Sequence, residues 1–168
     1  QAIDFYDKLL LYLDDPENIV NKVNILLKKA NIQELIGQWD SSMQTCNIAL
    51  LLADSHHLKI QKGRINNTLG NLYLLKGDYI SAKIVLENAI ELFQAEKDTK
   101  GLAIANGNLG NLYFRQGRYE EAKRYFIGAI EINQADNFPT SAQLVANLGL
   151  TYMNQNLFDL GIACLNDQ

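Results

Sequence analysis

Three asparagines, Asn31, Asn71 and Asn111, recur at intervals of 40 residues, each inside a stretch with helical apolar spacing. A carboxamide offers both hydrogen-bond donors and an acceptor. A row of such groups can hydrogen-bond the backbone of an extended peptide in either polarity, whatever side chains that peptide carries. The same amides can instead bridge neighbouring repeats through hydrogen bonds, and the sequence leaves both roles open.

No catalytic motif accompanies these amides. The sequence contains no G-x-S-x-G, Walker, HExxH or C-x-x-C pattern, and no nucleophile is paired with a base. His56 and His57 are adjacent in a predicted connection, so they lack the i, i+4 geometry of a helical metal pair. We therefore expect no enzymatic activity, no metal and no cofactor.

The composition is that of a folded chain without a general nucleic-acid-binding face. The chain has 168 residues, 48% of them hydrophobic, and a net charge of −4, whereas nucleic-acid binders usually carry a basic face. Apolar runs such as 48–53 are too short to cross a membrane. Cys46 and Cys164 are expected to be reduced core thiols. These features predict a cytoplasmic protein with no nucleic-acid partner and no membrane insertion.

The asparagines belong to a repeat of 40 residues. Segments 67–83 and 107–123 share Leu-Gly-Asn-Leu-Tyr, followed by Gly, Tyr, Ala and Lys at equal offsets. Self-similarity at such a period is typical of a solenoid, because one helix pair cannot bury its apolar surface and stacked neighbours can. The apolar spacing predicts helices over about 1–14, 17–36, 39–54, 58–76, 78–96, 99–116, 118–134, 140–155 and 157–168.

The predicted helix pairs are punctuated at regular positions. Gly37, Gly77, Gly117 and Asn156 follow one another at intervals of 40, 40 and 39 residues. Each stands where a helix C-terminus favours a left-handed residue; glycine adopts that conformation without a steric penalty, and asparagine is the usual second choice. Pro16, with acidic residues around it, predicts the start of a helix.

The second and third repeats resemble the tetratricopeptide repeat, whose pattern they match through Leu69-Gly70, Tyr73, Gly77 and Tyr79 and again 40 residues later. The fourth repeat matches well; the first departs, with Lys29 and Gln33 in place of Leu and Tyr. The resemblance implies an all-α fold, a right-handed superhelical solenoid of antiparallel helix pairs with about four repeats. The 40-residue period and the Leu-Gly-Asn tripeptides are similar to Leu-Gly-Asn repeat scaffolds of spindle orientation, to bacterial peptide-sensing regulators and, more loosely, to kinesin light chains.

A single repeat domain is expected to span residues 1–168. Residues 1–14 resemble the second helix of a preceding repeat, and the last helix stops partway, so we expect a fragment of a longer array. The predicted repeats cover 17–55, 58–97, 98–136 and 139–168.

In the family that the sequence resembles, the first helices of successive repeats line a concave groove. That resemblance places the asparagine row there and implies that it binds a peptide backbone, with the cations available for acidic side chains or a carboxylate. The basic set of a carboxylate-clamp chaperone is absent. The predicted peptide-binding residues are Asn31, Asn71, Asn108, Asn111, Asn147, Asn154, Gln143, Lys28, Arg64 and Arg115.

Three functions are compatible with these features. The favoured one is a scaffold that holds an extended segment of a partner protein or peptide in its groove. The second is a regulatory domain of a larger signalling protein that senses a short peptide. The third is a structural module, with possible self-association through the array ends.

Overall fold

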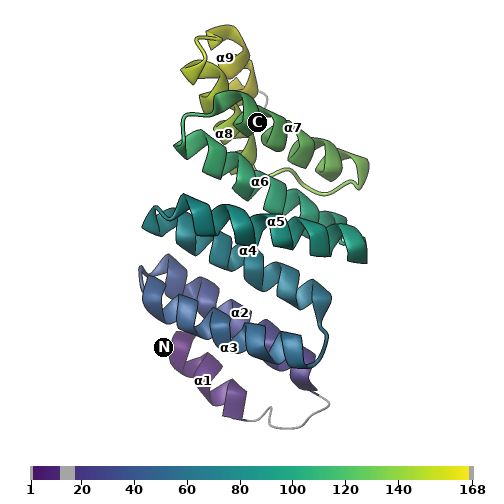
Figure 1. Cartoon of the computed structure of the whole chain (residues 1–168). Helices are drawn as coiled ribbons and strands as arrows, with labels where there is room; N and C mark the ends of the chain where they lie inside the picture. The colour runs from purple at the N-terminus through teal and green to yellow at the C-terminus, as the bar shows by residue number, and fades with distance from the viewer. Residues whose placement is uncertain (1, 12–17, 167–168) are drawn as a thin grey trace. The chain divides into compact units, whose positions relative to one another are not determined.

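The computed structural model describes residues 2–11 and 18–166, and every regular element in these ranges is an α-helix. The predicted helix start at Pro16 lies outside the described residues. The chain divides into two compact units, Gln1–Leu92 and Phe93–Gln168, and each is described by itself. The helices are α1 (Ala2–Leu11), α2 (Ile19–Leu35), α3 (Trp39–Ser55), α4 (Lys59–Lys76), α5 (Tyr79–Glu96), α6 (Thr99–Arg115), α7 (Tyr119–Ala135), α8 (Ala142–Asn154) and α9 (Phe158–Asn166) (Figure 1).

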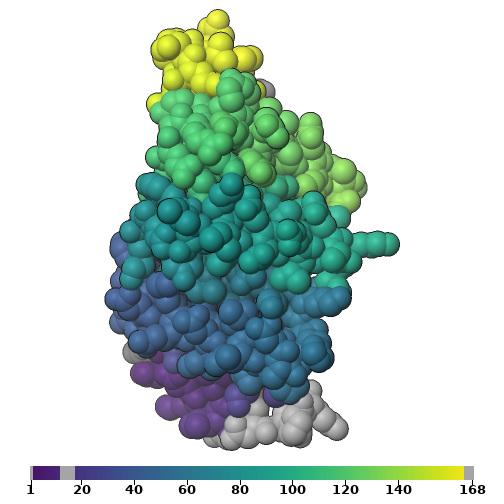
Figure 2. Space-filling view, in the orientation of Figure 1, coloured from purple at the N-terminus to yellow at the C-terminus, as the bar shows by residue number. Residues whose placement is uncertain are grey.

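Successive helices pack as hairpins inside each unit. In the first unit α2 packs against α1, α3 and α4, and α3 also packs against α4. In the second unit α6 and α7 pair, both contact α8, and α8 pairs with α9. Side chains fill the spaces between neighbouring ribbons of each unit (Figure 2). The predicted all-α helix pairs are confirmed; the right-handed twist of the superhelix stays a prediction.

The four predicted helix breaks all adopt the left-handed conformation. The φ angles are +78° at Gly37 and Gly77, +71° at Gly117 and +61° at Asn156. After each break, the next amide reaches back five residues to a helix carbonyl, as from Asp78 N to Tyr73 O at 2.9 Å. This is the Schellman geometry, and it satisfies carbonyls that the helix end leaves without an intrahelical partner.

A second series of left-handed residues lies between the repeats, and the sequence analysis missed it. His57, Lys97 and Asn137 have φ angles of +55°, +57° and +56°. They too are spaced by 40 residues and midway between the glycine breaks. Each is followed by the same five-residue hydrogen bond, such as Asp98 N to Phe93 O at 2.9 Å.

Substitution of Gly77 tests how much a left-handed glycine at a helix end contributes to the free energy of unfolding. An added Cβ at this position would have no atom within 4 Å, so the cost of Gly77→Ala is purely conformational. We expect Gly77→Ala to lower the free energy of unfolding by about 1–2 kcal/mol, the cost of placing an L-residue in this region. Gly77→Asn should lose less. Urea unfolding of the three proteins measures both values, and an alanine variant as stable as wild type would contradict the expectation.

The core matches small residues on one helix of a pair with large residues on the other. Gly70 of α4 lies against Leu86 of α5, and Gly110 of α6 lies against Phe126 of α7. The first repeat has Ala30 in the glycine position and the smaller Cys46 in the Leu86 position, both fully buried. A larger residue on one helix is thus accompanied by a smaller one on its partner.

The first repeat also carries a buried polar pair where the second and third repeats carry aromatic or branched side chains. Gln33, equivalent to Tyr73 and Tyr113, is 5% exposed, and Thr45 Oγ1 donates to its Oε1 at 2.8 Å. In the third repeat the equivalent side chains, Tyr113 and Tyr125, stack with ring centroids 5.3 Å apart. The first repeat therefore departs from the pattern in chemistry while keeping the same helix pairing.

The two cysteines, both predicted to lie in the core, differ in their burial. Cys46 is buried, as expected, whereas Cys164 is only half-buried.

Lys29, in the position of Leu69, reaches the neighbouring α1, where its Nζ lies 2.5 Å from Asp7 Oδ1. The lysine replaces an apolar contact with an ion pair at the edge of the first unit.

Candidate functional site

All ten predicted site residues lie on the first helices of the pairs, as the repeat register requires. In the first unit, α2 carries Lys28 and Asn31 and α4 carries Arg64 and Asn71. In the second unit, α6 and α8 carry the other six. Their side chains are exposed or half-buried; the three cations, Gln143, Asn31 and Asn154 are exposed.

Three amides of the second unit form one hydrogen-bonded chain. Gln143 Nε2 donates to Asn147 Oδ1 at 2.7 Å, and Asn147 Nδ2 donates to Asn111 Oδ1, also at 2.7 Å. The first bond runs along α8 by one helical turn, and the second connects α8 to α6. Each end amide takes part in this chain through one of its two polar atoms, which leaves the other polar atom of Asn111 and of Gln143 available to a ligand.

A pocket of about 310 Å³ opens beside this amide chain, in the second unit. Four predicted residues line it: Asn108, Asn111, Gln143 and Asn147. The sequence analysis missed the rest of its lining, which is mostly apolar and includes Lys100, Ile104, Gly107, Phe138, Pro139 and Leu144. The structure therefore brings the amides together with an apolar cavity that was not anticipated.

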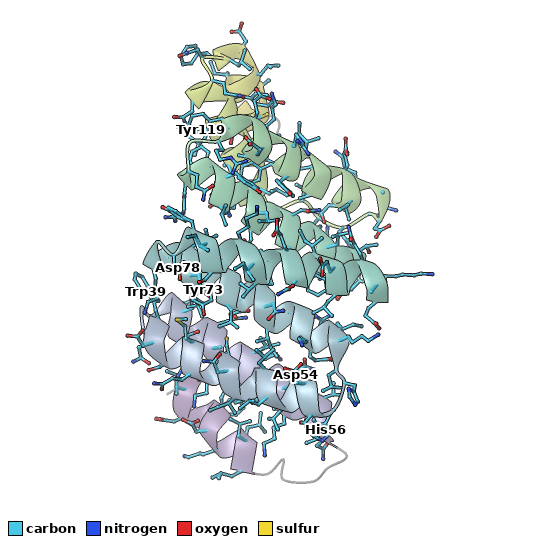
Figure 3. The ribbon with its side chains drawn as sticks, viewed as in Figure 1. Trp39, Asp54, His56, Tyr73, Asp78 and Tyr119 are labelled. Atoms are coloured by element: carbon cyan, nitrogen blue, oxygen red, sulfur yellow. The ribbon has the colours of Figure 1, made fainter. Side chains whose placement is uncertain are left out.

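The two remaining predicted residues of the second unit lie outside the pocket lining. Arg115 is exposed in the last turn of α6. Asn154 donates through Nδ2 to Leu150 O at 2.8 Å, and its Oδ1 accepts from the Tyr119 hydroxyl at 3.3 Å. Tyr119, labelled in Figure 3, also packs edge-on against Phe114 with centroids 5.7 Å apart. These contacts give Asn154 a role in joining α7 to α8.

Asparagines of the first unit also connect neighbouring first helices. Asn71 Nδ2 of α4 donates to Glu34 Oε1 of α2 at 2.5 Å. Thr68 Oγ1 lies 3.5 Å from Asn31 Oδ1, at the register of the Asn147–Asn111 bond, and 3.2 Å from Arg64 O of its own helix. Hydrogen bonds between repeats, the alternative left open by the sequence, are thus present in both units. Each of these hydrogen bonds uses only one of the two polar atoms of a carboxamide. Peptide binding by these residues stays a prediction.

Glu34 is the acidic group of this helix face whose ionisation is most affected by its surroundings. Burial raises the pKa of its carboxyl, and the hydrogen bond from Asn71 opposes that rise. Burial, followed by the charge of Glu34, raises the pKa of the Cys46 thiol to about 12. Cys46 is therefore a poor nucleophile at neutral pH, and the polar face of the first unit contains a carboxylate that is costly to ionise.

The pKa of Glu34 predicts a pH-dependent effect of Glu34→Gln. Because the folded-state pKa lies above the ordinary value of 4.5, the carboxylate destabilises the fold at pH values above the folded-state pKa, and this cost disappears below 4.5. Glutamine still accepts the hydrogen bond from Asn71. We expect Glu34→Gln to unfold at higher urea concentration than wild type at pH 7, with the difference vanishing near pH 4. A variant less stable than wild type at pH 7 would contradict this.

Neither a metal centre nor a membrane span is found in the parts of the chain that the structure describes. Those residues contain no group of three or more His, Cys, Asp or Glu side chains placed to hold a metal. His56 instead contacts its own helix end, with Nδ1 3.0 Å from Leu52 O (Figure 3). None of the helices in the described ranges is long and apolar enough to cross a bilayer.

Helix pairs, a 40-residue period and left-handed breaks define an all-α helical-repeat solenoid. Part of the chain, 75 of its 168 residues, matches the tetratricopeptide repeat family. Residues 61–135 match the family model described as "Tetratricopeptide repeat", and these residues include most of the predicted second and third repeats. Comparison with curated protein sequences gives no match.

Solved structures of similar fold cover nearly the whole chain. BtubC from P. vanneervenii is 20% identical with a TM-score of 0.79, covering 98% of this chain and 69% of that one. A Rap protein, in complex with Competence and Sporulation Factor, is 24% identical with a TM-score of 0.89, covering 98% and 46%. MamA is 21% identical with a TM-score of 0.63, covering 98% and 82%. At these identities the likeness shows the fold, and the chain spans less than half of the Rap protein.

Proposed function

We propose that the chain is an interaction scaffold that binds an extended segment of a partner protein or peptide along the first helices of its repeats. The observation that carries the proposal is the amide chain of Gln143, Asn147 and Asn111 beside an apolar pocket. Backbone N–H and C=O groups of an extended segment are the natural complement of carboxamides. The scaffold acts in this proposal by binding and not by catalysis.

The orientation of the amide chain supports this assignment. Asn111 joins the chain through Oδ1, so its Nδ2 can donate to a ligand carbonyl. Gln143 joins through Nε2, so its Oε1 can accept from a ligand N–H. The two ends thus present a donor and an acceptor fixed by the bonds between them, which lowers the entropy lost when a ligand binds.

In this proposal the asparagines and cations of the first unit also contact the bound segment. Asn71 and Asn31 occupy the same register on α4 and α2, with the exposed Lys28 and Arg64 nearby in sequence on the same helices. The cations would contact acidic side chains or a carboxylate of the bound segment. The Rap protein's complex with Competence and Sporulation Factor supports ligand binding as a use of this fold.

Binding measurements on Asn111→Ala test the proposal. A random twelve-residue peptide display library is selected on the full chain, and enriched peptides are synthesised for fluorescence anisotropy. We expect Asn111→Ala to weaken binding at least tenfold, because a ligand carbonyl loses its donor in a partly desolvated site. Asn88→Ala, an exposed asparagine on the second helix of its pair, is the matched control and should bind as wild type.

Unfolding of the same variants separates binding from a structural role. Asn111→Ala removes the acceptor of the Asn147 bond, so a small loss of stability is expected, within about 1 kcal/mol because the site is only partly buried. Unchanged peptide affinity together with a large loss of stability would assign the asparagine to bridging α6 and α8, and the proposed function would fall.

A further inference from the structure

The pocket of the second unit exists because α8 begins late in the repeat. Helices α4 and α6 begin 40 residues apart, at Lys59 and Thr99, and the same register places the start of the next first helix at residue 139. Instead α8 begins at Ala142. Ser141 is its N-cap, in extended conformation with ψ 138°, and its side chain accepts from Leu144 N. The missing first turn leaves space beside the N-terminal half of α6.

A glycine and apolar side chains form the wall of that space. Gly107 of α6 faces α8, where an added Cβ would meet only Leu144 Cδ1 at 3.5 Å, an ordinary contact. Ile104, one turn earlier on α6, is 51% exposed and lines the same pocket. Phe138 and Pro139 of the α7–α8 connection complete it. An apolar cavity of this kind is stabilised by an apolar occupant.

The lining of the pocket contains one charged residue. Lys100 is the only charged residue among those that line it, and its Nζ lies 5.9 Å from the centroid of the Phe138 ring. The amides Asn108, Asn111 and Asn147 line the pocket as well. The lining therefore combines apolar side chains, several amides and a single cation.

We infer that this pocket is a subsite for one large apolar side chain, leucine, isoleucine, methionine or phenylalanine, of a bound extended peptide that carries an acidic residue next to it. The inference rests on the proposed function. A volume of about 310 Å³ is at the lower end of ligand pockets, roughly 300–1,000 Å³, so it suits a side chain and its backbone. The acidic neighbour is the charge complement of Lys100.

Glycine substitutions supply the test. Gly107→Leu places an isobutyl group on the pocket wall, and a leucine on a helix points back toward the preceding turn, here toward Ile104. Gly107→Ala is the milder variant and should fold at least as stably as wild type, since alanine is favoured over glycine in a helix. Gly128→Ala of α7, whose Cβ would meet nothing within 4 Å, is the matched control outside the pocket.

Peptides enriched from the display library on the full chain are expected to share one large apolar residue with Asp or Glu within two positions. Replacing that apolar residue by alanine should weaken binding to wild type and to Gly128→Ala at least tenfold. Gly107→Leu should bind the original peptide at least tenfold more weakly than wild type does. Replacing the apolar residue of the peptide by alanine should weaken binding to this variant only a little further, because the two changes remove the same contact. Lys100→Gln should remove the preference for the acidic residue.

The outcomes separate the subsite from the proposed function. If Asn111→Ala abolishes binding while Gly107→Leu binds as wild type, the amide role stands and the apolar subsite is wrong. If no peptide binds wild type above background, the proposed function falls and the subsite falls with it. If Gly107→Leu does not fold by circular dichroism, Gly107→Ala decides: an affinity equal to that of Gly128→Ala overturns the subsite.

Discussion

The Gly110→Ala variant is expected to lose about 1–3 kcal/mol of unfolding free energy, the usual cost of overpacking a well-packed core. The added Cβ would lie 2.5 Å from Cε1 of the Phe126 ring, and Phe126 is fully buried. The ring has no solvent-filled space into which it can move, so α6 and α7 must separate or the ring must leave its rotamer. Urea unfolding monitored by circular dichroism measures the loss.

A double-mutant cycle shows whether the loss comes from this contact. Phe126→Cys installs the residue that the first repeat has opposite Ala30, and by itself it should be strongly destabilising because it leaves a cavity. In that background Gly110→Ala should cost almost nothing. Gly128→Ala, a helical glycine with open space around it, should be neutral or stabilising. If the losses of unfolding free energy for Gly110→Ala and Phe126→Cys are additive, the Phe126 ring does not limit the size of the side chain at position 110.

The Thr45→Val variant is expected to lose about 1–3 kcal/mol, the cost of leaving a buried polar group without a partner. Thr45 Oγ1 lies 2.8 Å from Gln33 Oε1 and 2.9 Å from Ser41 O, and Gln33 and Thr45 are each 5% exposed. Valine has nearly the same shape as threonine, so packing is retained while the amide oxygen of Gln33 loses its donor. Equilibrium unfolding in urea gives the difference.

The second repeat supplies the compensating change for this variant. Tyr73 and Val85 occupy the positions of Gln33 and Thr45, so the double variant Gln33→Tyr/Thr45→Val installs the second-repeat pair in the first repeat. We expect the double variant to recover part of the stability lost by Thr45→Val alone. A Thr45→Val protein as stable as wild type would show that Gln33 finds another partner.

Much of the fold was predictable because its signals are local and periodic. Gly77 and Gly117 have no side chain to oppose a left-handed turn, so their positions mark helix ends directly. In the second series only Asn137 is a residue type that favours this conformation, and His57 and Lys97 carried no comparable signal. Histidine and lysine adopt the left-handed region only under the constraint of the surrounding helices, and their residue types do not indicate it.

The candidate site was predictable only in part, for a similar reason. The register placed Asn111 and Asn147 on neighbouring first helices, and the structure connects their side chains at 2.7 Å. The pocket beside them depends on the late start of α8 and on the position of the Phe138 connection, which are not periodic features. Lys100 and Gly107 differ from the residues at the same register in the second repeat, Ile60 and Asn67. Their place in the pocket lining is therefore recognisable only from the residues that surround them in the structure.

The size matching inside the helix pairs limits how this sequence can be rearranged. Ala30 stands opposite a cysteine position, whereas Gly70 and Gly110 stand opposite leucine and phenylalanine. A chimera that exchanges single helices between the first repeat and the second or third would set the Ala30 methyl group against a large side chain, or leave a void between a glycine and Cys46. Duplication, deletion or transplantation of a complete hairpin keeps each match. The helix pair, and not the single helix, is therefore the module that recombination or protein engineering can exchange.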